Sequence, residues 1–390
     1  EGPDVGGPYG PYRQSDRFGI YHDVLEKLKD LGCVYPCYCT VEELESEREN
    51  QLAKGLPPKY SGKCRNLSDE ERKKLEEAGR LPSWRFKVPQ KPGKVEFYDE
   101  VHKHYALSYR EVGDFILVRS DGIPTYIFAA VVDDHYMQIT HVIRGDDHLP
   151  NTIRQVLLYQ ALSWDPPSFA HIPMILSREG RKLSKREGAE GISELRKKGY
   201  LPEAVRAYLA TLSWAVEGED FLFDPDAMAQ AFDLCSISRS SPIHDENRLR
   251  WWGNKALKQK DALWLAERLI AIAREKDLKP SCSSKTLASL LPEALSDQAT
   301  IIEVFESLIW LFMRPQKSDE MPLWIEELAK ELSGVGRWDK EEIEGVLKAF
   351  QRKLGIRAKE FFHPIRMAIT GSHSGPPLPL VMEVLGKDEV

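Results

Sequence analysis

Residues 124–162 read PTYIFAAVVDDHYMQITHVIRGDDHLPNTIRQVLLYQAL, and this stretch decides the expected fold. The continuous apolar run 126–132 predicts a strand that is buried on both faces, as in a parallel sheet. Residues 139–144 predict a second strand, Gly145 a turn, and the apolar spacing after Pro150 a helix. Strand, loop and helix in this order form the local unit of a doubly wound α/β domain, whose ligands gather at the carboxyl ends of the strands.

The next segment carries a basic loop. Residues 171–176 (HIPMIL) predict a third strand, and KLSKR follows at 182–186. Between Arg178 and Gly199 there are eight basic and four acidic residues, a local charge of +4 in a chain of net charge −7. Two lysines on such a loop can stabilise the charge that develops on the phosphate oxygens of a nucleotide. Taken alone, the same run is more typical of a solvated charged surface.

The composition is that of an ordinary globular protein. The chain has 390 residues, of which 42% are hydrophobic and 29% charged, so a polybasic protein is excluded. At roughly 100–200 residues per domain, about two to four domains are expected. The longest strongly apolar run, 126–132, is far shorter than the roughly 20 residues that span a bilayer, so no membrane partner is expected. Six cysteines are too few for a disulfide scaffold and favour a reducing, cytoplasmic location.

The remaining sequence separates into mixed and helical parts. Helical spacing is expected over 16–31, and acidic helices are expected after the N-capping residues Thr40 and Ser68. Residues 84–119 alternate short β-like pieces with Pro and Gly. From Pro202 onward the pattern is predominantly helical.

The KLSKR loop, between a strand and a helical region, resembles the KMSKS signature of class I aminoacyl-tRNA synthetases. Further stretches narrow the resemblance and lie in order along nearly the whole chain: GPYGPYRQSDR (7–17), the stretch 124–162, HIPMILSREGRKLSKREGA (171–189), FDLCSISRSSPIHDENRLRWW (232–252) and MAITGSHSGPPLPLVMEVLG (367–386). Together they are similar to bacterial-type glutamyl-tRNA synthetase.

This resemblance implies an α/β fold in four parts. They are a Rossmann-like catalytic domain at 1–32 and 115–176, an inserted α+β acceptor-binding domain at 33–114, a KLSKR loop and stem-contact region at 177–254, and an all-α anticodon-binding domain at 255–390. The HIGH signature of the family is not found in its expected place, and the resemblance puts it before Glu1. We therefore expect an N-terminally incomplete catalytic domain that is inactive as an isolated fragment.

The resemblance implies a glutamate–tRNA ligase that acts as a monomer. It would use ATP and Mg²⁺ to activate L-glutamate as glutamyl-adenylate, and then esterify the 3′ end of tRNA(Glu). The expected catalytic residues are Lys182 and Lys185. The expected ATP-binding residues are Asp147, Ile175, Leu176, Lys182, Leu183, Ser184, Lys185 and Arg186. In the C-terminal helices, the expected phosphate contacts to tRNA are Arg352, Lys353, Arg357, Lys359 and Arg366.

The resemblance places Tyr126, Ala130 and Arg144 in the glutamate pocket. Arg144 suits this role, because a planar guanidinium can pair bidentately with the side-chain carboxylate of the substrate. Ala130 stands where members of the family often have Asn, so an amide contact to the amino acid is not expected here.

Cys37, Cys39 and Cys64 have a spacing that favours a structural zinc site. Zinc takes four ligands, and three cysteines supply three of them. Tyr60, four residues before Cys64, resembles the tyrosine ligand of the related glutamyl-queuosine enzymes and is the expected fourth. Three ordinary reduced cysteines are the alternative interpretation.

Other functions are open at this point. A glutamyl-queuosine tRNA(Asp) synthetase-like paralogue shares the Cys/Tyr pattern but has no long helical anticodon domain. A non-catalytic tRNA-binding module is a second alternative. A glutaminyl-tRNA synthetase would end in β-barrels, whereas this sequence ends in a helical pattern.

Overall fold

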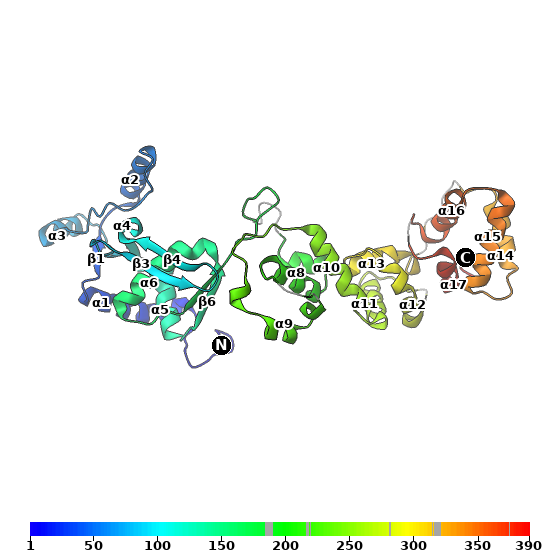
Figure 1. Cartoon of the computed structure of the whole chain (residues 1–390), viewed down its shortest axis with the longest axis horizontal. Helices are drawn as coiled ribbons and strands as arrows, with labels where there is room; N and C mark the ends of the chain where they lie inside the picture. Colours follow the sequence, from blue (N-terminus) through cyan, green and yellow to red (C-terminus); the bar gives the residue numbers. More distant parts are fainter. Residues whose placement is uncertain are drawn as a thin grey trace. The chain divides into compact units, whose positions relative to one another are not determined.

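The computed structural model describes residues 1–183, 190–215, 218, 220–280, 282–313, 315, 321–373 and 375–390. The chain folds into two compact units (Figure 1). The first consists of residues 1–174 and 233–241, and the second of residues 175–232 and 242–390. Each unit has a hydrophobic core of its own.

The first unit opens with the helix that the sequence predicts. A short 3-10 helix, η1 (Gln14–Arg17), leads into α1 (Phe18–Asp30). The apolar residues on one face of α1 are buried, and they are Tyr21, Val24, Leu25 and Leu28. Gly32 follows with a φ of 66°, a left-handed conformation that glycine adopts without steric cost, and so lets the chain leave the helix.

Three antiparallel strands form a small sheet in the order β1-β2-β5. They are β1 (Val34–Cys37), β2 (Ser83–Phe86) and β5 (Phe115–Val118). Two helices, α2 (Val41–Ala53) and α3 (Asp69–Glu77), lie between β1 and β2 in the sequence. Each begins with a capping box, at Thr40 and Ser68, and this confirms both predicted helix starts.

A second, mixed sheet of four strands has the order β4-β3-β7-β6. Its strands are β3 (Lys94–Asp99), β4 (Lys103–Ser108), β6 (His141–Gly145) and β7 (Ser168–Ile172). The β3–β4 pair is antiparallel, whereas β7 runs parallel to both β3 and β6. The predicted strand at 139–144 is confirmed as β6, whereas the third strand, predicted at 171–176, lies earlier in the sequence as β7 at 168–172. It ends at Ile172, since Pro173 has no N–H with which to continue the ladder.

The prediction of a strand at 126–132 is wrong, because these residues belong to helix α5 (Tyr126–Tyr136). Phe128, Val131 and Val132 are spaced three and four residues apart and lie fully buried on one face of the helix. Asp133 also lies inside α5, where it accepts hydrogen bonds from Arg17 Nε at 2.6 Å and from the Tyr21 hydroxyl at 2.9 Å.

Helix α6 (Leu149–Leu162) follows β6 through the short 3-10 helix η2 (Asp146–His148), with Pro150 in its first turn. A one-turn helix, α4 (Tyr109–Val112), precedes β5. Helices α1, α5 and α6 contribute to the core of the first unit together with both sheets, and its most deeply buried members are Leu28, Leu117, Phe128, Val131, Val132 and Leu158. The strand–loop–helix unit built by β6 and α6 is the part of the expected α/β fold that positions the site.

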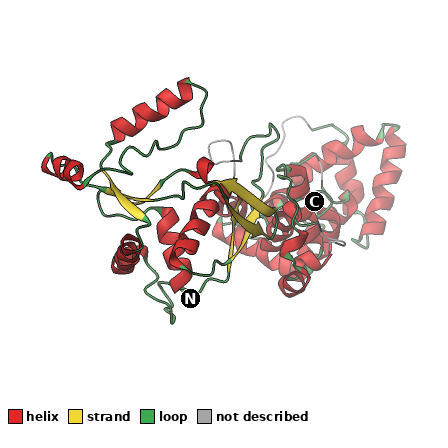
Figure 2. Cartoon of the chain, turned by 60° about the vertical axis from the view of Figure 1, so that its left-hand side comes forward, coloured by secondary structure: helices red, strands yellow, loops and turns green. Residues whose placement is uncertain are grey.

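The second unit is helical, and Figure 2 distinguishes its helices from the strands of the first unit. Its helices are α7 (Ile192–Lys197), α8 (Pro202–Ser213), α9 (Pro225–Ala231), α10 (Glu246–Lys258), α11 (Ala262–Glu275), α12 (Ser284–Ala294), α13 (Ile301–Ser307), α14 (Ile325–Ser333), α15 (Lys340–Leu354), α16 (Ala358–Thr370) and α17 (Leu378–Leu385). Its main core surrounds Trp252, and a smaller core surrounds Phe350 and Phe361. Within the described part of the chain, no helix is both long and apolar enough to cross a membrane.

Candidate active site and metal site

Arg144 lies near the carboxyl end of the parallel strand β6, and the structure brings it against Tyr126, the first residue of α5. Its Nη1 donates a hydrogen bond to the Tyr126 hydroxyl at 2.9 Å. Its Nη2 donates to Thr152 Oγ1 and to Gln155 Oε1, both at 2.5 Å, and its Nε donates to His171 Nε2 at 3.2 Å. Two of the three residues predicted for the glutamate pocket are thus in direct contact.

The three other partners of Arg144 were not predicted. Thr152, Gln155 and His171 are at most 1% exposed, whereas Tyr126 is 51% exposed. The guanidinium is therefore fixed from its buried side and accessible from the side of Tyr126. A signal did exist for two of these partners, because Thr152 and Gln155 are polar residues on the otherwise apolar buried face of α6.

A buried carboxylate lies behind this cluster. Asp99, the last residue of β3, has its Oδ2 at 2.6 Å from His171 Nδ1, and both side chains are fully buried. Strand pairing explains the proximity, because β7 lies between β3 and β6, and His171 is the direct parallel neighbour of Arg144. Because they are direct neighbours on paired strands, the side chains of His171 and Arg144 project from the same face of the sheet.

Two further predicted site residues, Ala130 and Asp147, belong to the first unit and lie on α5 and directly after β6. Ala130 is half-buried one helical turn after Tyr126 on α5 and offers only a methyl group. Asp147 lies in η2, directly after β6, in the loop that leads into α6. The carboxylate of Asp147 approaches Gly145 so closely that a Cβ on Gly145 would lie 2.7 Å from its Oδ1. A side chain at this turn would have to displace the ends of the Asp147 and Met174 side chains.

The predicted nucleotide-binding segment forms a hairpin in the second unit. Leu176 forms an antiparallel bridge with Lys182, and the N–H of Leu183 donates to the carbonyl of Ile175 at 3.0 Å. The N–H of Leu176 donates to the carbonyl of Pro242 at 2.9 Å, so the hairpin base is tied to the segment that precedes α10. The remaining predicted residues of the loop, Ser184, Lys185 and Arg186, lie outside the described residues.

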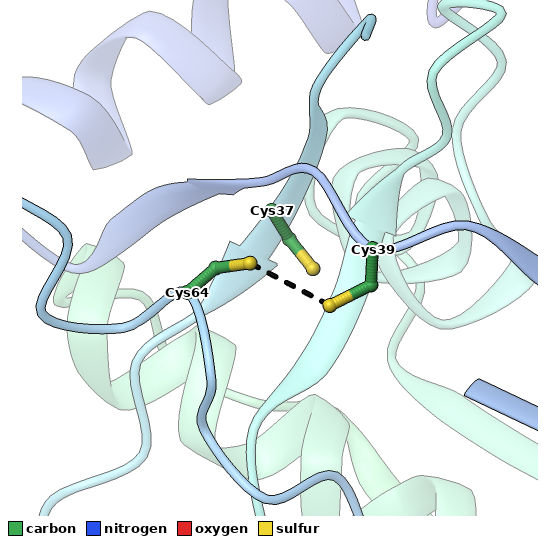
Figure 3. Close-up of side chains that lie close together, drawn as sticks. All are labelled: Cys37, Cys39 and Cys64. Atoms are coloured by element: carbon green, nitrogen blue, oxygen red, sulfur yellow. Dashed lines mark hydrogen bonds between the residues drawn. The ribbon is translucent and has the colours of Figure 1, made fainter. Parts of the chain in front are cut away.

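The four predicted metal ligands come together (Figure 3 shows the three cysteines). The sulfur atoms of Cys37, Cys39 and Cys64 all lie within 4.8 Å of one another. The Tyr60 hydroxyl lies 3.5 Å from the sulfur of Cys37 and 3.6 Å from that of Cys39. For comparison, a tetrahedral zinc ion with Zn–S bonds of about 2.3 Å sets its sulfur ligands about 3.8 Å apart. The donor set and its spacing therefore fit zinc.

The electrostatics of this cluster favour a thiolate. Hydrogen bonding with Cys64 lowers the pKa of the Cys37 thiol against the opposing effect of burial, and Tyr60 and Arg85 lower it further. The guanidinium of Arg85 stacks on the Tyr60 ring, with its Cζ 3.8 Å from the ring centroid. The thiolate is the form of cysteine that binds zinc, so the lowered pKa of Cys37 favours binding, whereas burial raises the pKa of Cys39, and hydrogen bonding with Cys37 together with burial raises that of Cys64.

Comparison with known proteins identifies the family models that match this chain. The family model described as tRNA synthetases class I (E and Q), catalytic domain, matches residues 3–251. The model described as anticodon binding domain matches residues 265–390.

Relatives of this chain are known from both sequence and structure. A glutamate–tRNA ligase from Bacillus licheniformis is 40% identical over 411 residues, which cover all of this chain and 84% of that protein. One from Listeria welshimeri is 39% identical and is covered over 83% of its length. The crystal structure of a glutamate tRNA ligase from Elizabethkingia meningosepticum, in complex with its amino acid, matches with a TM-score of 0.85 and 29% identity, over 100% of this chain and 84% of that one. The chain belongs to the glutamate–tRNA ligase family of class I aminoacyl-tRNA synthetases.

Proposed function

We propose that this protein ligates L-glutamate to tRNA(Glu) and that Arg144, together with Tyr126, binds the side-chain carboxylate of the substrate. The observation that carries the proposal is the Arg144 guanidinium, held in place by buried partners at the carboxyl end of a parallel strand and bonded on its open side to the Tyr126 hydroxyl. Arginine and a tyrosine hydroxyl both donate hydrogen bonds, which suits a carboxylate better than a carboxamide.

The reaction has two steps. An oxygen of the glutamate α-carboxylate attacks the α-phosphate of ATP, so that a carboxyl–phosphate bond forms and pyrophosphate leaves. A hydroxyl at the 3′ end of the tRNA then attacks the carbonyl carbon of glutamyl-adenylate, and AMP leaves. No nucleophile from the protein is required, and Mg²⁺ enters with the triphosphate to neutralise its charge.

The hairpin at 175–183 is the proposed platform for ATP. Lys182, with Lys185, would stabilise the charge on the departing pyrophosphate, and Ile175 and Leu176 would hold the adenine through their backbone. The N–H of Leu176 already donates to the carbonyl of Pro242, and its carbonyl accepts from the N–H of His244. The carbonyl oxygen has a second lone pair, so it can accept one further hydrogen bond, whereas the N–H cannot donate another. Leu183, Ser184, Arg186 and Asp147 complete the proposed nucleotide-binding set.

Substitution of the proposed carboxylate-binding arginine tests the function. In the enzyme expressed from its complete gene, we expect Arg144→Gln to raise the KM for glutamate by about 10- to 150-fold, because a charged hydrogen bond to the substrate contributes about 1.5–3 kcal/mol. The KM for ATP should stay within about twofold. Aminoacylation of purified tRNA(Glu) measures both constants, and an unchanged KM for glutamate would refute the proposed site.

Cys37, Cys39, Tyr60 and Cys64 are proposed to hold a structural zinc ion. The ion would tie β1 to the connector between α2 and α3, where few apolar side chains are buried: α2 and α3 bury none. It would have no part in the chemistry of aminoacylation.

The choice of tRNA separates the remaining candidate from the proposal. The Cys/Tyr cluster also fits a glutamyl-queuosine tRNA(Asp) synthetase-like paralogue, whereas the anticodon-binding model over 265–390 supports the glutamate enzyme. Transfer of glutamate to tRNA(Asp) but not to tRNA(Glu) would decide for the paralogue. The four-part domain division and the monomeric state stay predictions.

A further inference from the structure

Arg144 is oriented almost entirely by neutral acceptors. A guanidinium has five N–H groups, and four of those of Arg144 are bonded to His171, Thr152, Gln155 and Tyr126. The fifth belongs to Nη1, which is the nitrogen beside the exposed Tyr126. Among the described residues, no carboxylate forms an ion pair with the Arg144 guanidinium. The Asp134 carboxyl interacts with the charge of Arg144 from farther away, and burial raises the pKa of that carboxyl to about 6. The charge of Arg144 is therefore not neutralised directly by the protein and can attract a carboxylate of the substrate.

The bond from Arg144 to His171 assigns the tautomer of the histidine. Because Nε of arginine can only donate, its bond to His171 requires Nε2 to accept and to carry no proton. The Thr152 hydroxyl lies 2.8 Å from the same Nε2 and donates to it, while its oxygen accepts from Arg144 Nη2. The proton of the neutral ring is then on Nδ1, which donates to Asp99 Oδ2 at 2.6 Å. A protonated ring, or the opposite tautomer, would set two N–H groups against each other at 3.2 Å.

Asp99 is held as a carboxylate in a fixed orientation. Its Oδ1 accepts from the backbone N–H groups of Val101 at 3.0 Å and His102 at 2.7 Å, and its Oδ2 accepts from the backbone N–H of His171 at 3.1 Å. Burial alone would raise the pKa of Asp99, but the hydrogen bonds from His171 and from the backbone outweigh burial and lower it. An ionised carboxylate can only accept hydrogen bonds, so it keeps the proton of His171 on Nδ1.

We propose that Asp99 and His171 are positioning residues for glutamate recognition, with Asp99 fixing the His171 tautomer and the Nε2 lone pair of His171 orienting Arg144 so that Nη1 faces the substrate carboxylate. The inference rests on the proposed role of Arg144 in binding glutamate. The proposal also explains why a histidine, rather than a carboxylate, bonds to Arg144. A carboxylate in direct contact with Arg144 would compete with the substrate, whereas a neutral imidazole orients the arginine and leaves its charge available.

Asp99→Asn is the decisive variant. The amide oxygen would stay with the N–H groups of Val101 and His102, so the amide NH₂ would face His171 Nδ1 and drive the histidine proton to Nε2, opposite Arg144. In the enzyme expressed from its complete gene, we expect the KM for glutamate to rise by about 10- to 100-fold, the scale typical of an outer-shell partner, and the KM for ATP to stay within about twofold.

The matched control is Asp114→Asn, which also alters a buried carboxylate of the first unit. Asp114 accepts hydrogen bonds from Arg65, Tyr35 and the N–H of Val88, and none of these partners contacts Arg144. We expect it to lower the melting temperature while the KM for glutamate stays within about twofold. An equal rise in both variants would mean that the loss in Asp99→Asn is only structural.

A double-mutant cycle separates this inference from the proposed function. If Asp99 acts through Arg144, Asp99→Asn should add less than about threefold to the KM for glutamate once Arg144→Gln is present. Effects of the two substitutions that multiply in full, or no effect of Asp99→Asn alone, would overturn the inference. No effect of Arg144→Gln alone would instead overturn the proposed glutamate site.

A measurement on the unsubstituted protein covers the case in which Asp99→Asn does not fold. Nitrogen-15 NMR of histidine-labelled protein, with the signal assigned through His171→Gln, reports which ring nitrogen carries the proton. We expect a protonated Nδ1 and an unprotonated Nε2. The opposite tautomer or a doubly protonated ring at neutral pH would overturn the inference.

Discussion

At the scale of single residues, the proposed sites consist of side chains that are far apart in the sequence. Residue types and short spacing pointed to the cysteine group, whereas Arg144 and Tyr126 were expected only from the resemblance to glutamyl-tRNA synthetases. Asp99 and His171 could not be found in this way, because 72 residues separate them and only the pairing of three strands brings them together. Predicting such a pair requires the strand order, which a single sequence does not specify.

The metal site gives a prediction at this scale. Metal analysis of the purified protein should find about one zinc per chain, and Cys64→Ser should abolish binding, because three ligands in place of four leave the coordination incomplete. The same variant should lose the stabilisation that bound zinc supplies, about 3 kcal/mol when free zinc exceeds its Kd by 100-fold.

Cys235→Ser provides the matched control for this loss. Cys235 is exposed, and its sulfur contacts Glu100 rather than another cysteine. The variant should keep its full zinc content and its melting temperature. Well under one zinc per chain in the unsubstituted protein would support the alternative of three reduced cysteines.

At the scale of elements, helix starts were easier to predict than the type of a short apolar segment. The capping residues Thr40 and Ser68 mark α2 and α3 in the sequence because their side chains bond to the backbone of their own first turns. By contrast, YIFAAVV at 126–132 contains β-branched and aromatic residues that suit a buried strand, and it forms most of α5 instead. Burial against α1 and α6 decides its conformation, since a run of seven apolar residues satisfies either period.

Close packing between helices gives a prediction at the scale of elements. Gly253 lies inside α10, and a Cβ there would clash with the backbone carbonyl oxygen of Ala299 and lie 3.1 Å from the Tyr200 ring. We expect Gly253→Ala to destabilise the second unit by about 1–3 kcal/mol, because overpacking outweighs the higher helix propensity of alanine. Urea denaturation, followed by circular dichroism, measures the change.

Gly345→Ala is the matched control, since Gly345 is also inside a helix, α15, but a Cβ there meets nothing within 4 Å. It should stabilise the protein by up to about 1 kcal/mol. If both substitutions stabilise the protein equally, the approach of α10 to Ala299 is looser than the structure shows.

At the scale of the whole molecule, a net charge of −7 repels a polyanion, so tRNA must bind through local basic surfaces. The basic residues that follow Arg352 are not equivalent in this respect. Lys353 is paired with Glu327 at 2.8 Å and with Glu331 at 2.9 Å, whereas Arg357 is exposed at the start of α16. The sequence offered both as phosphate contacts and could not tell them apart, because their acidic neighbours come from another helix.

The salt dependence of tRNA binding tests this difference. We expect Arg357→Ala to weaken binding several-fold and to reduce the slope of log K against log salt by about 1, as expected for the loss of one phosphate contact. Lys353→Ala should change the slope less, since its ammonium is already neutralised. Filter binding of tRNA(Glu) between about 50 and 200 mM salt measures both slopes, and equal losses would contradict the distinction.

The alignment of β6 beside β7 has a consequence for how amino-acid choice could change in such a protein. Arg144 faces His171 only because the two strands pair at those positions, with Ile143 and Gly145 directed to the opposite side. Inserting or deleting one residue early in β6 would turn the arginine away and present an isoleucine or a glycine instead. Insertions or deletions there would therefore abolish the proposed recognition of glutamate as completely as replacing the arginine, although every residue of the site would still be present in the sequence.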